Sequence, residues 1–182
     1  MAFRYRITDI DKLKDRAVFF DANVLIYLFW PNPQQTWQQK YSLIYGRLLK
    51  QKNPLVVNIS VLSEVINRIL RIEYDNYCKK NTIQKEQFPF KSYRDTPDGI
   101  DAQKLIYDII KEKVLSVFAL SEKSITVEEL KQMLLVDSLD FGDKIITLQC
   151  KEKQYILLTN DNDFLQSDID ILSANSKIFT TS

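Results

Sequence analysis

The stretch VFFDANVLIY at residues 18–27 indicates the fold, because a short apolar run ends in an acidic residue and a helical pattern follows. Ala17–Phe20 has the length and composition of a buried strand, and Asp21 stands at its end. Val24–Trp30 continues apolar and predicts a helix. Asp21 is therefore expected where a strand gives way to the helix that follows it.

The same alternation of strand and helix continues along the chain. Further strands are predicted at Leu55–Ile59, Val117–Leu120, Tyr155–Leu158 and Ile169–Leu172, with Ile178–Phe179 as another candidate for the last one. Helical patterns lie between them, at about 36–51, from Ser60, and at about 99–114, 126–135 and 140–151. This order predicts an α/β protein with three layers, α/β/α, around a central parallel sheet of about four to five strands.

Residues 74–99 have a different composition. They are polar, with Phe88, Phe90 and Tyr93 spaced among lysines, and they contain too little apolar material for a core of their own. We therefore expect residues 1–182 to form a single domain, with an insertion or helical excursion at about 74–99.

Composition excludes several classes of function. The 182 residues contain no histidine, which removes Ser-His-Asp and Cys-His triads and histidine metal ligands. Three glycines leave no phosphate-binding loop or dinucleotide fingerprint. Cys78 and Cys150 form neither a disulfide framework nor a zinc motif, and a reducing compartment is the default. The net charge of +1 means that any surface for nucleic acid must be a local patch.

The cytoplasm is the expected location. The longest apolar stretch, Ala17–Trp30, contains Asp21 and Asn23, so it is too short and too polar to span a membrane. It also starts too late for a signal peptide.

Acidic residues follow the apolar runs at four places. These are Asp21, Glu64 in VNISVLSEVINR (57–68), Asp140 and Asp143 in LDFGDKIITL (139–148), and Asp161 and Asp163 in YILLTNDNDF (155–164). Each alone is better explained as a turn or cap residue than as a functional one, and Glu64 as an acid favoured in the first turn of a helix. Asn23 can orient Asp21 through a hydrogen bond or cap the next helix.

Together these acids need a different explanation, because the carboxyl ends of parallel strands meet at one edge of a sheet. Two unit charges ~4 Å apart repel by about 4 kcal/mol at an effective dielectric of 20. A hard cation such as Mg²⁺ or Mn²⁺ removes this repulsion and prefers oxygen ligands, whereas a site without histidine or cysteine argues against zinc.

With these motifs the chain resembles the PIN-domain nucleases, from about Val18 to Phe179 apart from 74–99. The matching elements are the opening Asp-x-Asn pattern (Asp21, Asn23), the Ser-x-x-x-Glu element (Ser60, Glu64), a helix start of the form Asp-x-x-Ile (Asp143) and the closing Thr-x-Asp-x-Asp-Phe pattern (Thr159, Asp161, Asp163, Phe164). The resemblance implies a PIN-like fold and metal-dependent hydrolysis of RNA phosphodiester bonds, with Mg²⁺ or Mn²⁺ as the cofactor.

The resemblance also implies roles for individual residues. Metal-ligating and catalytic roles fall to Asp21, Glu64, Asp143 and Asp161, with Asp140 and Asp163 as further candidate ligands. Asn23, Ser60 and Thr159 would orient these ligands through hydrogen bonds. Arg68, Arg71 and Lys144 are candidate RNA contacts, although an ordinary solvated basic face explains them equally well.

The resemblance implies partners too. Many small PIN proteins are VapC-type toxins that are silenced by an antitoxin, and PIN domains commonly pair as homodimers. This chain departs from the toxins in its length and in residues 74–99.

Three other functions compete with the ribonuclease. A haloacid-dehalogenase-type phosphatase also places an aspartate after its first strand, but it requires a second aspartate where this chain has Asn23. A structure-specific DNA nuclease shares a PIN-like sheet and usually carries more acids. An inactive PIN scaffold would bind RNA or protein without cutting.

Overall fold

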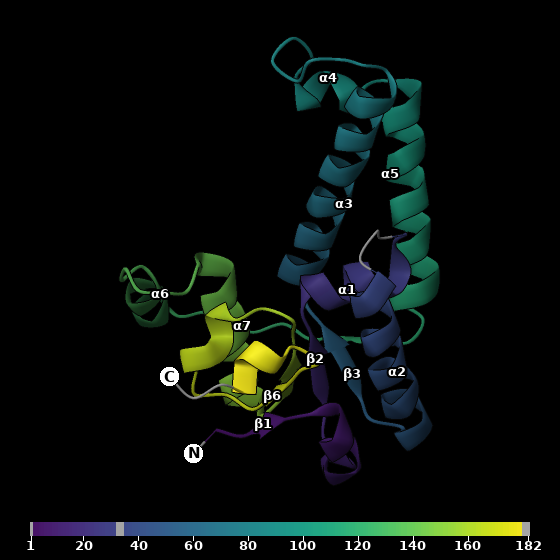
Figure 1. The fold of residues 1–182 in the computed structure, drawn as a ribbon. Coiled ribbons are helices and arrows are strands. Elements are labelled where there is room, and N and C mark those ends of the chain that lie inside the picture. Colours follow the sequence, from purple (N-terminus) through teal and green to yellow (C-terminus); the bar gives the residue numbers. More distant parts are fainter. Residues whose placement is uncertain (1, 32–34, 180–182) are drawn as a thin grey trace.

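The computed structural model describes residues 2–31 and 35–179, and a parallel sheet of six strands lies at its centre in these residues (Figure 1). The strands are β1 (Arg4–Tyr5), β2 (Val18–Phe20), β3 (Leu55–Val57), β4 (Ala119–Leu120), β5 (Ile156–Leu158) and β6 (Ile171–Leu172), in the spatial order β1-β6-β5-β2-β3-β4. Every neighbouring pair is parallel. The predicted α/β class and parallel sheet are confirmed, with six strands rather than four to five.

Helices flank the sheet and connect its strands. They are α1 (Ala22–Phe29), α2 (Gln35–Gln51), α3 (Ile59–Lys80), α4 (Phe90–Arg94), α5 (Pro97–Ile109), α6 (Val127–Met133) and α7 (Phe141–Lys153). Shorter helical turns are η1 (Ile7–Leu13), η2 (Ile110–Val114), η3 (Asp163–Gln166) and η4 (Ser176–Phe179). Helices α1 and α2 lie on one side of the sheet and α6 and α7 on the other (Figure 1). No helix within the described ranges is both long and apolar enough to cross a membrane.

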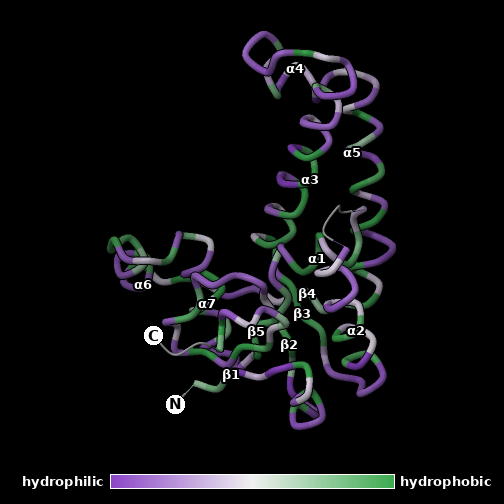
Figure 2. Tube along the Cα trace, viewed as in Figure 1, coloured by the Kyte–Doolittle hydropathy of each residue, from purple (hydrophilic) through white to green (hydrophobic). Residues whose placement is uncertain are grey.

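The middle of the sheet forms the hydrophobic core. All residues of β2, β3 and β5 are buried, because helices cover both faces, which explains why these strands are apolar throughout rather than alternating. Figure 2 shows these strands in green, the colour of hydrophobic residues, at the centre of the fold. The register places Phe20 opposite Leu158, so Asp21 and Thr159 leave the sheet side by side.

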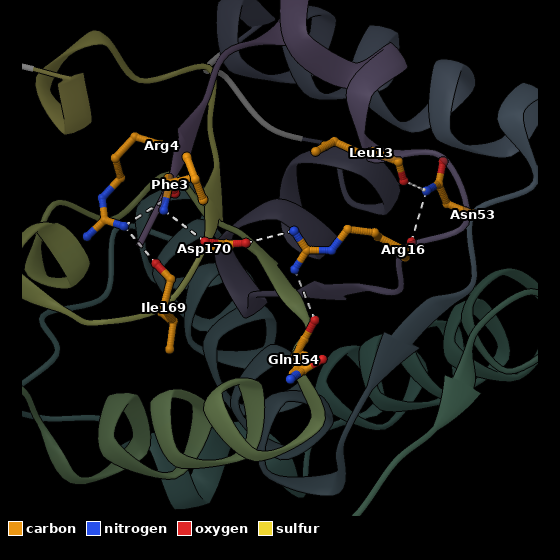
Figure 3. A network of polar contacts seen from close by, with 8 residues as sticks. All are labelled: Phe3, Arg4, Leu13, Arg16, Asn53, Gln154, Ile169 and Asp170. Atoms are coloured by element: carbon orange, nitrogen blue, oxygen red, sulfur yellow. Dashed lines mark hydrogen bonds and ion pairs between the residues drawn. The ribbon is translucent and has the colours of Figure 1, made fainter. Parts of the chain in front are cut away.

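The first strand, β1, was not predicted, because it lies in a polar segment of only two paired residues. Its neighbour β6 is buried in the hydrophobic core, and side-chain hydrogen bonds hold the two strands together at their start (Figure 3). The Arg4 guanidinium donates to the carbonyl of Ile169 at 2.6 Å, and Asp170 accepts from the Phe3 amide at 2.8 Å and from Arg16 at 2.7 Å. Asp170 and Arg16 precede strands β6 and β2, so these bonds lie at the opposite end of the strands from Asp21.

Several predicted bounds differ from those in the structure by one or two residues. The predicted strand Leu55–Ile59 ends at Val57, because Asn58 caps α3 by accepting from the amide of Val61 at 2.8 Å. The candidate strand Ile178–Phe179 lies in η4 and is not a strand.

Residues 74–99 form the far end of α3, the helix α4 and the start of α5, and they project away from the sheet (Figure 1). They contain a small apolar cluster of their own, with Tyr74, Cys78 and Tyr93 buried. Sequence composition did not predict this cluster. We propose that the projection belongs to a single domain, because α3 starts directly after β3 and the chain returns to the sheet at β4.

Candidate active site

Asp21 lies at the carboxyl end of β2 and is the residue that precedes α1. Its side chain is buried, with 4% of the residue exposed. Oδ2 accepts a hydrogen bond from Thr159 Oγ1 at 2.7 Å and from Asn23 Nδ2 at 3.2 Å. The hydrogen bond that was considered between Asn23 and Asp21 is thus present, and both bonds hold the carboxylate in one position.

Burial raises the pKa of Asp21 to about 6. The hydrogen bonds from Thr159 and Asn23 act in the opposite direction, because they stabilise the ionised form, and the charge of Glu64 raises the pKa further. The residue is thus a carboxylate whose negative charge is poorly compensated by the protein alone.

Asp143 stands in the first turn of α7 and is half-buried on the same side of the molecule. Asp140 caps this helix, as predicted, by accepting from the amide of Asp143 at 2.8 Å. Burial raises the pKa of Asp143 to about 7, and the charges of Asp140, Asp21, Asp161 and Asp163 raise it as well. Acids from three separate segments of the chain therefore lie within electrostatic range of one another.

The loop after β5 contributes the remaining aspartates. Thr159 is fully buried, and its hydroxyl accepts from the amide of Asp161 at 2.9 Å while it donates to Asp21. Asp161 in turn accepts from the amide of Asp163 at 3.0 Å, and Asp163 is exposed at the start of η3. A single hydroxyl therefore links the acids of β2 and of this loop.

Glu64 projects from the second turn of α3, since the helix begins at Ile59. The first-turn dipole explanation for Glu64 is therefore wrong. Its Oε1 accepts from Arg68 at 3.0 Å, and both side chains are close to half exposed. Its charge reaches Asp21, since it contributes to the raised pKa of that residue.

A family model for the PIN domain matches residues 18–170, a range that contains all six of these acids. The chain belongs to the PIN domain family. PIN domains are nucleases as a family and generally use divalent metal ions. No curated protein sequence matches the chain.

Solved structures of similar fold include two bacterial complexes. The chain is similar to FitAcB from Neisseria gonorrhoeae, with 12% identity and a TM-score of 0.54, over 85% of this chain and 96% of that one. It is also similar to VapBC2 from Rickettsia felis bound to a DNA fragment from their promoter, with 13% identity and a TM-score of 0.49, over 86% of this chain and 98% of that one. At these identities the likeness to FitAcB shows a shared fold.

The start of α3 in this PIN domain is held by residues that sequence reasoning missed. Ser60 is exposed at the second position of the helix, whereas Asn58 is buried. The Asn58 amide donates to Gln149 Oε1 at 2.8 Å, and Gln149 donates to the carbonyl of Ser121 at 2.8 Å. Asn58 is a polar residue directly after the apolar strand β3, and this position was a signal that the sequence offered. Its contact with Gln149 could not be predicted, because the two residues are distant in sequence.

The candidate RNA contacts Arg68 and Arg71 lie on α3 in different surroundings. Arg68 pairs with Glu64 and is exposed beside the acids. The Arg71 guanidinium lies over the ring of Phe90, 4.9 Å from its centroid, in the helical projection. Only Arg68 of these two has a recorded contact with one of the acids.

Lys144, the third candidate, is engaged inside the protein. Its ammonium donates to the carbonyl of Met133 at 3.1 Å and to that of Leu135, and it pairs with Asp137 at 3.1 Å. Its side chain is only 10% exposed. The geometry gives this lysine the role of fixing the connection between α6 and α7.

The donor set fits a hard divalent cation in its chemistry. All six acids offer oxygen, and the mutual charges that raise the pKa of Asp143 are those a cation would compensate. The hydroxyl of Thr147, one helical turn after Asp143, is buried without a hydrogen-bond partner in the described part of the chain. Within residues 2–31 and 35–179, however, no group of three or more His, Cys, Asp or Glu side chains is arranged so that it could hold a metal ion.

Proposed function

We propose that this PIN protein is a metal-dependent endoribonuclease, a hydrolase that cuts RNA phosphodiester bonds with Mg²⁺ or Mn²⁺. The observation that carries the proposal is the position of Asp21: it is buried, anchored by two hydrogen bonds, and within range of the charge of Asp143. A protein gains no stability from such an arrangement, because burial and repulsion both oppose ionisation. A site that binds a cation explains it.

The acidic residues are proposed as the metal ligands. Asp21, Glu64, Asp143 and Asp161 would hold the metal, with Asp140 and Asp163 as further candidate ligands at the rim. When bound, the ion lowers the pKa of a water molecule and offsets negative charge on the phosphate.

The protein positions these ligands before any ion binds. The Thr159 hydroxyl and the Asn23 amide keep the Asp21 oxygen in place, and Thr159 also fixes the backbone of Asp161. Asp140 holds the first turn of α7, which carries Asp143. Arg68, held beside Glu64, offers a positive charge for the RNA backbone. Ser60 stays a candidate for orienting the bound ligands, from its exposed position on α3.

The biological setting is part of the proposal. The motifs that resemble VapC-type toxins support a toxin of a toxin–antitoxin pair, with an antitoxin protein and a second copy of the chain as partners. Such a protein would act on RNA in the cytoplasm.

The test is cleavage of a mixed panel of single-stranded and structured RNAs, with a flap DNA of matched sequence. Wild type and Asp21→Asn are each assayed with Mg²⁺, with Mn²⁺ and with chelator. We expect wild type to cut RNA only with a divalent ion and the variant to cut nothing. Preference for the flap DNA would replace the proposal with a DNA nuclease, and RNA binding without cleavage would replace it with an inactive scaffold.

A further inference from the structure

A cleft of about 340 Å³ opens directly beside the acidic site. Asn23 and Asp161 line it, and both belong to the site already described. The volume lies near the lower end of the range for small-molecule pockets, so the cleft is large enough for one planar group. Anything bound here lies next to the carboxylates.

One wall of the cleft is aromatic. Trp37 of α2 and Tyr27 of α1 line it, and both are partly exposed. The ring of Tyr41 supports them from behind: its centroid lies 5.7 Å from that of Tyr27, in a stacked arrangement, and 6.3 Å from that of Trp37. The Lys40 ammonium lies 4.8 Å from the Trp37 ring centroid, which puts a cation at this wall. A rigid aromatic surface next to a cation suits a flat ring that carries a phosphate.

The other wall carries three asparagine side chains, and Lys177 lines the cleft as well. Asn175 Nδ2 donates to the carbonyl of Asn160 at 2.8 Å and to Oδ1 of Asn162 at 3.0 Å. Tyr41 Oη donates to Oδ1 of Asn160 at 2.9 Å. Oδ1 of Asn162 is occupied in this way, whereas its Nδ2 has no hydrogen-bond acceptor among the described residues and can donate to a ligand. Oδ1 of Asn23 can accept, because that residue uses Nδ2 to donate to Asp21.

We propose that this cleft binds one nucleobase of the RNA strand, next to the phosphate at the acids, and thereby selects the sequence that is cut; this inference rests on the proposed function. Unpaired bases are recognised by stacking on aromatic rings and by hydrogen bonds to their edges, and the cleft offers both. A base is uncharged, so it tolerates the carboxylate of Asp161, and its amino groups can donate to it.

The first test measures binding of nucleoside 5′-monophosphates in chelator, where no cleavage occurs. The chain has two tryptophans, and Trp30 is buried, so a Trp30→Phe background reports Trp37 emission alone. We expect AMP, GMP, CMP or UMP to quench this emission with a preference among the bases, and ribose 5-phosphate to have no effect. Equal behaviour of ribose 5-phosphate and the nucleotides, or no response to any of them, would overturn the inference.

Variants then assign the walls. Tyr27→Ala removes a stacking surface and should weaken binding of the preferred nucleotide roughly 5- to 150-fold. Asn162→Ala removes one donor and should weaken it roughly 2- to 12-fold and flatten the preference among bases. Asn76→Ala, an exposed amide in the helical projection, serves as the matched control and should change nothing. If Trp30→Phe or Tyr27→Ala does not fold, saturation-transfer NMR on wild type and Asn162→Ala gives the same comparison.

The two proposals fail separately. Nucleotide binding without any cleavage of RNA would leave the base cleft standing and remove the nuclease. Metal-dependent cleavage with identical cut sites in wild type and Asn162→Ala, together with no nucleotide binding, would leave the nuclease standing and remove the base cleft.

Discussion

Replacing Asp21 by asparagine is expected to stabilise the metal-free protein at alkaline pH while it abolishes cleavage. The pKa of Asp21 rises from its ordinary value of 3.8 to about 6 in the fold. Below pH 3.8 Asp21 is protonated in both the folded and the unfolded chain, and its contribution to stability is fully present. As the pH rises, the unfolded chain ionises at Asp21 before the folded one, so this stability is lost up to a pH of about 6. This rise in pKa destabilises the folded protein by about 3 kcal/mol at a pH where both the folded and the unfolded chain are ionised at Asp21.

Part of this gain is offset in the variant. The amide oxygen of an asparagine at position 21 can still accept from Thr159 and Asn23. Its NH₂ group takes the place of the other carboxylate oxygen, which accepts from the backbone of Ala22, and an NH₂ group cannot accept this bond. An unfavourable contact of this kind costs roughly 1–2 kcal/mol. The variant should therefore be more stable than wild type by about 1–2 kcal/mol at pH 8, and about equal to it near pH 5.

Urea denaturation in chelator at both pH values measures this difference. Asp101→Asn, an exposed acid on α5, is the matched control and should track wild type at both. Adding Mn²⁺ should reverse the order at pH 8, because only wild type retains the central ligand. A difference between Asp21→Asn and wild type that does not change between pH 5 and pH 8 would refute the argument that Asp21 ionises against a burial penalty.

Three further substitutions test the surroundings of the site and the helical projection. Thr159→Val removes the bond that lowers the pKa of Asp21, so the pH profile of cleavage should move to higher pH; an unmoved profile would contradict this role. Tyr41→Phe removes a buried hydroxyl with several partners and should lower the free energy of unfolding by roughly 1–3 kcal/mol in urea titrations. Gly99→Ala would place a Cβ atom 2.1 Å from the carbonyl oxygen of Tyr93, so hydrogen exchange should speed up in the helical projection and not in the central strands.

The sequence predicted the parts of the fold that depend on local pattern. The three central strands are apolar throughout. The helix predicted at about 126–135 begins after Thr126, which forms a capping box with Glu129, and the helix predicted at about 140–151 begins after its cap Asp140. The edge strand β1 could not be predicted, because two residues carry no periodicity and their place depends on pairing with β6, the bonds of Arg4 and the packing of Tyr5 against the core. The same holds for the cluster around Tyr74 in the projection, which exists because α3 and α4 meet in space.

The neighbouring positions of Asp21 and of the loop with Asp161 were predictable, because they follow β2 and β5 and the ends of parallel strands gather at one edge of a sheet. Glu64 and Asp143 lie instead within α3 and α7. The hydrogen bonds that organise the site were predictable only where the partners are close in sequence, as for Asn23 and Asp21. Asn58 with Gln149, and Asn175 with Asn162, are paired by the tertiary fold. Asparagines in such loops look like turn residues until their partners are known.

The measurement that tests the central claim most directly is cleavage of one labelled RNA by wild type and Asp21→Asn purified in parallel from the same host. The account predicts cutting by wild type with Mg²⁺ or Mn²⁺, products without a 2′,3′-cyclic phosphate, and no cutting by the variant or in chelator. Cleavage that persists in Asp21→Asn, or in chelator, would contradict the claim that a metal held by these carboxylates hydrolyses RNA.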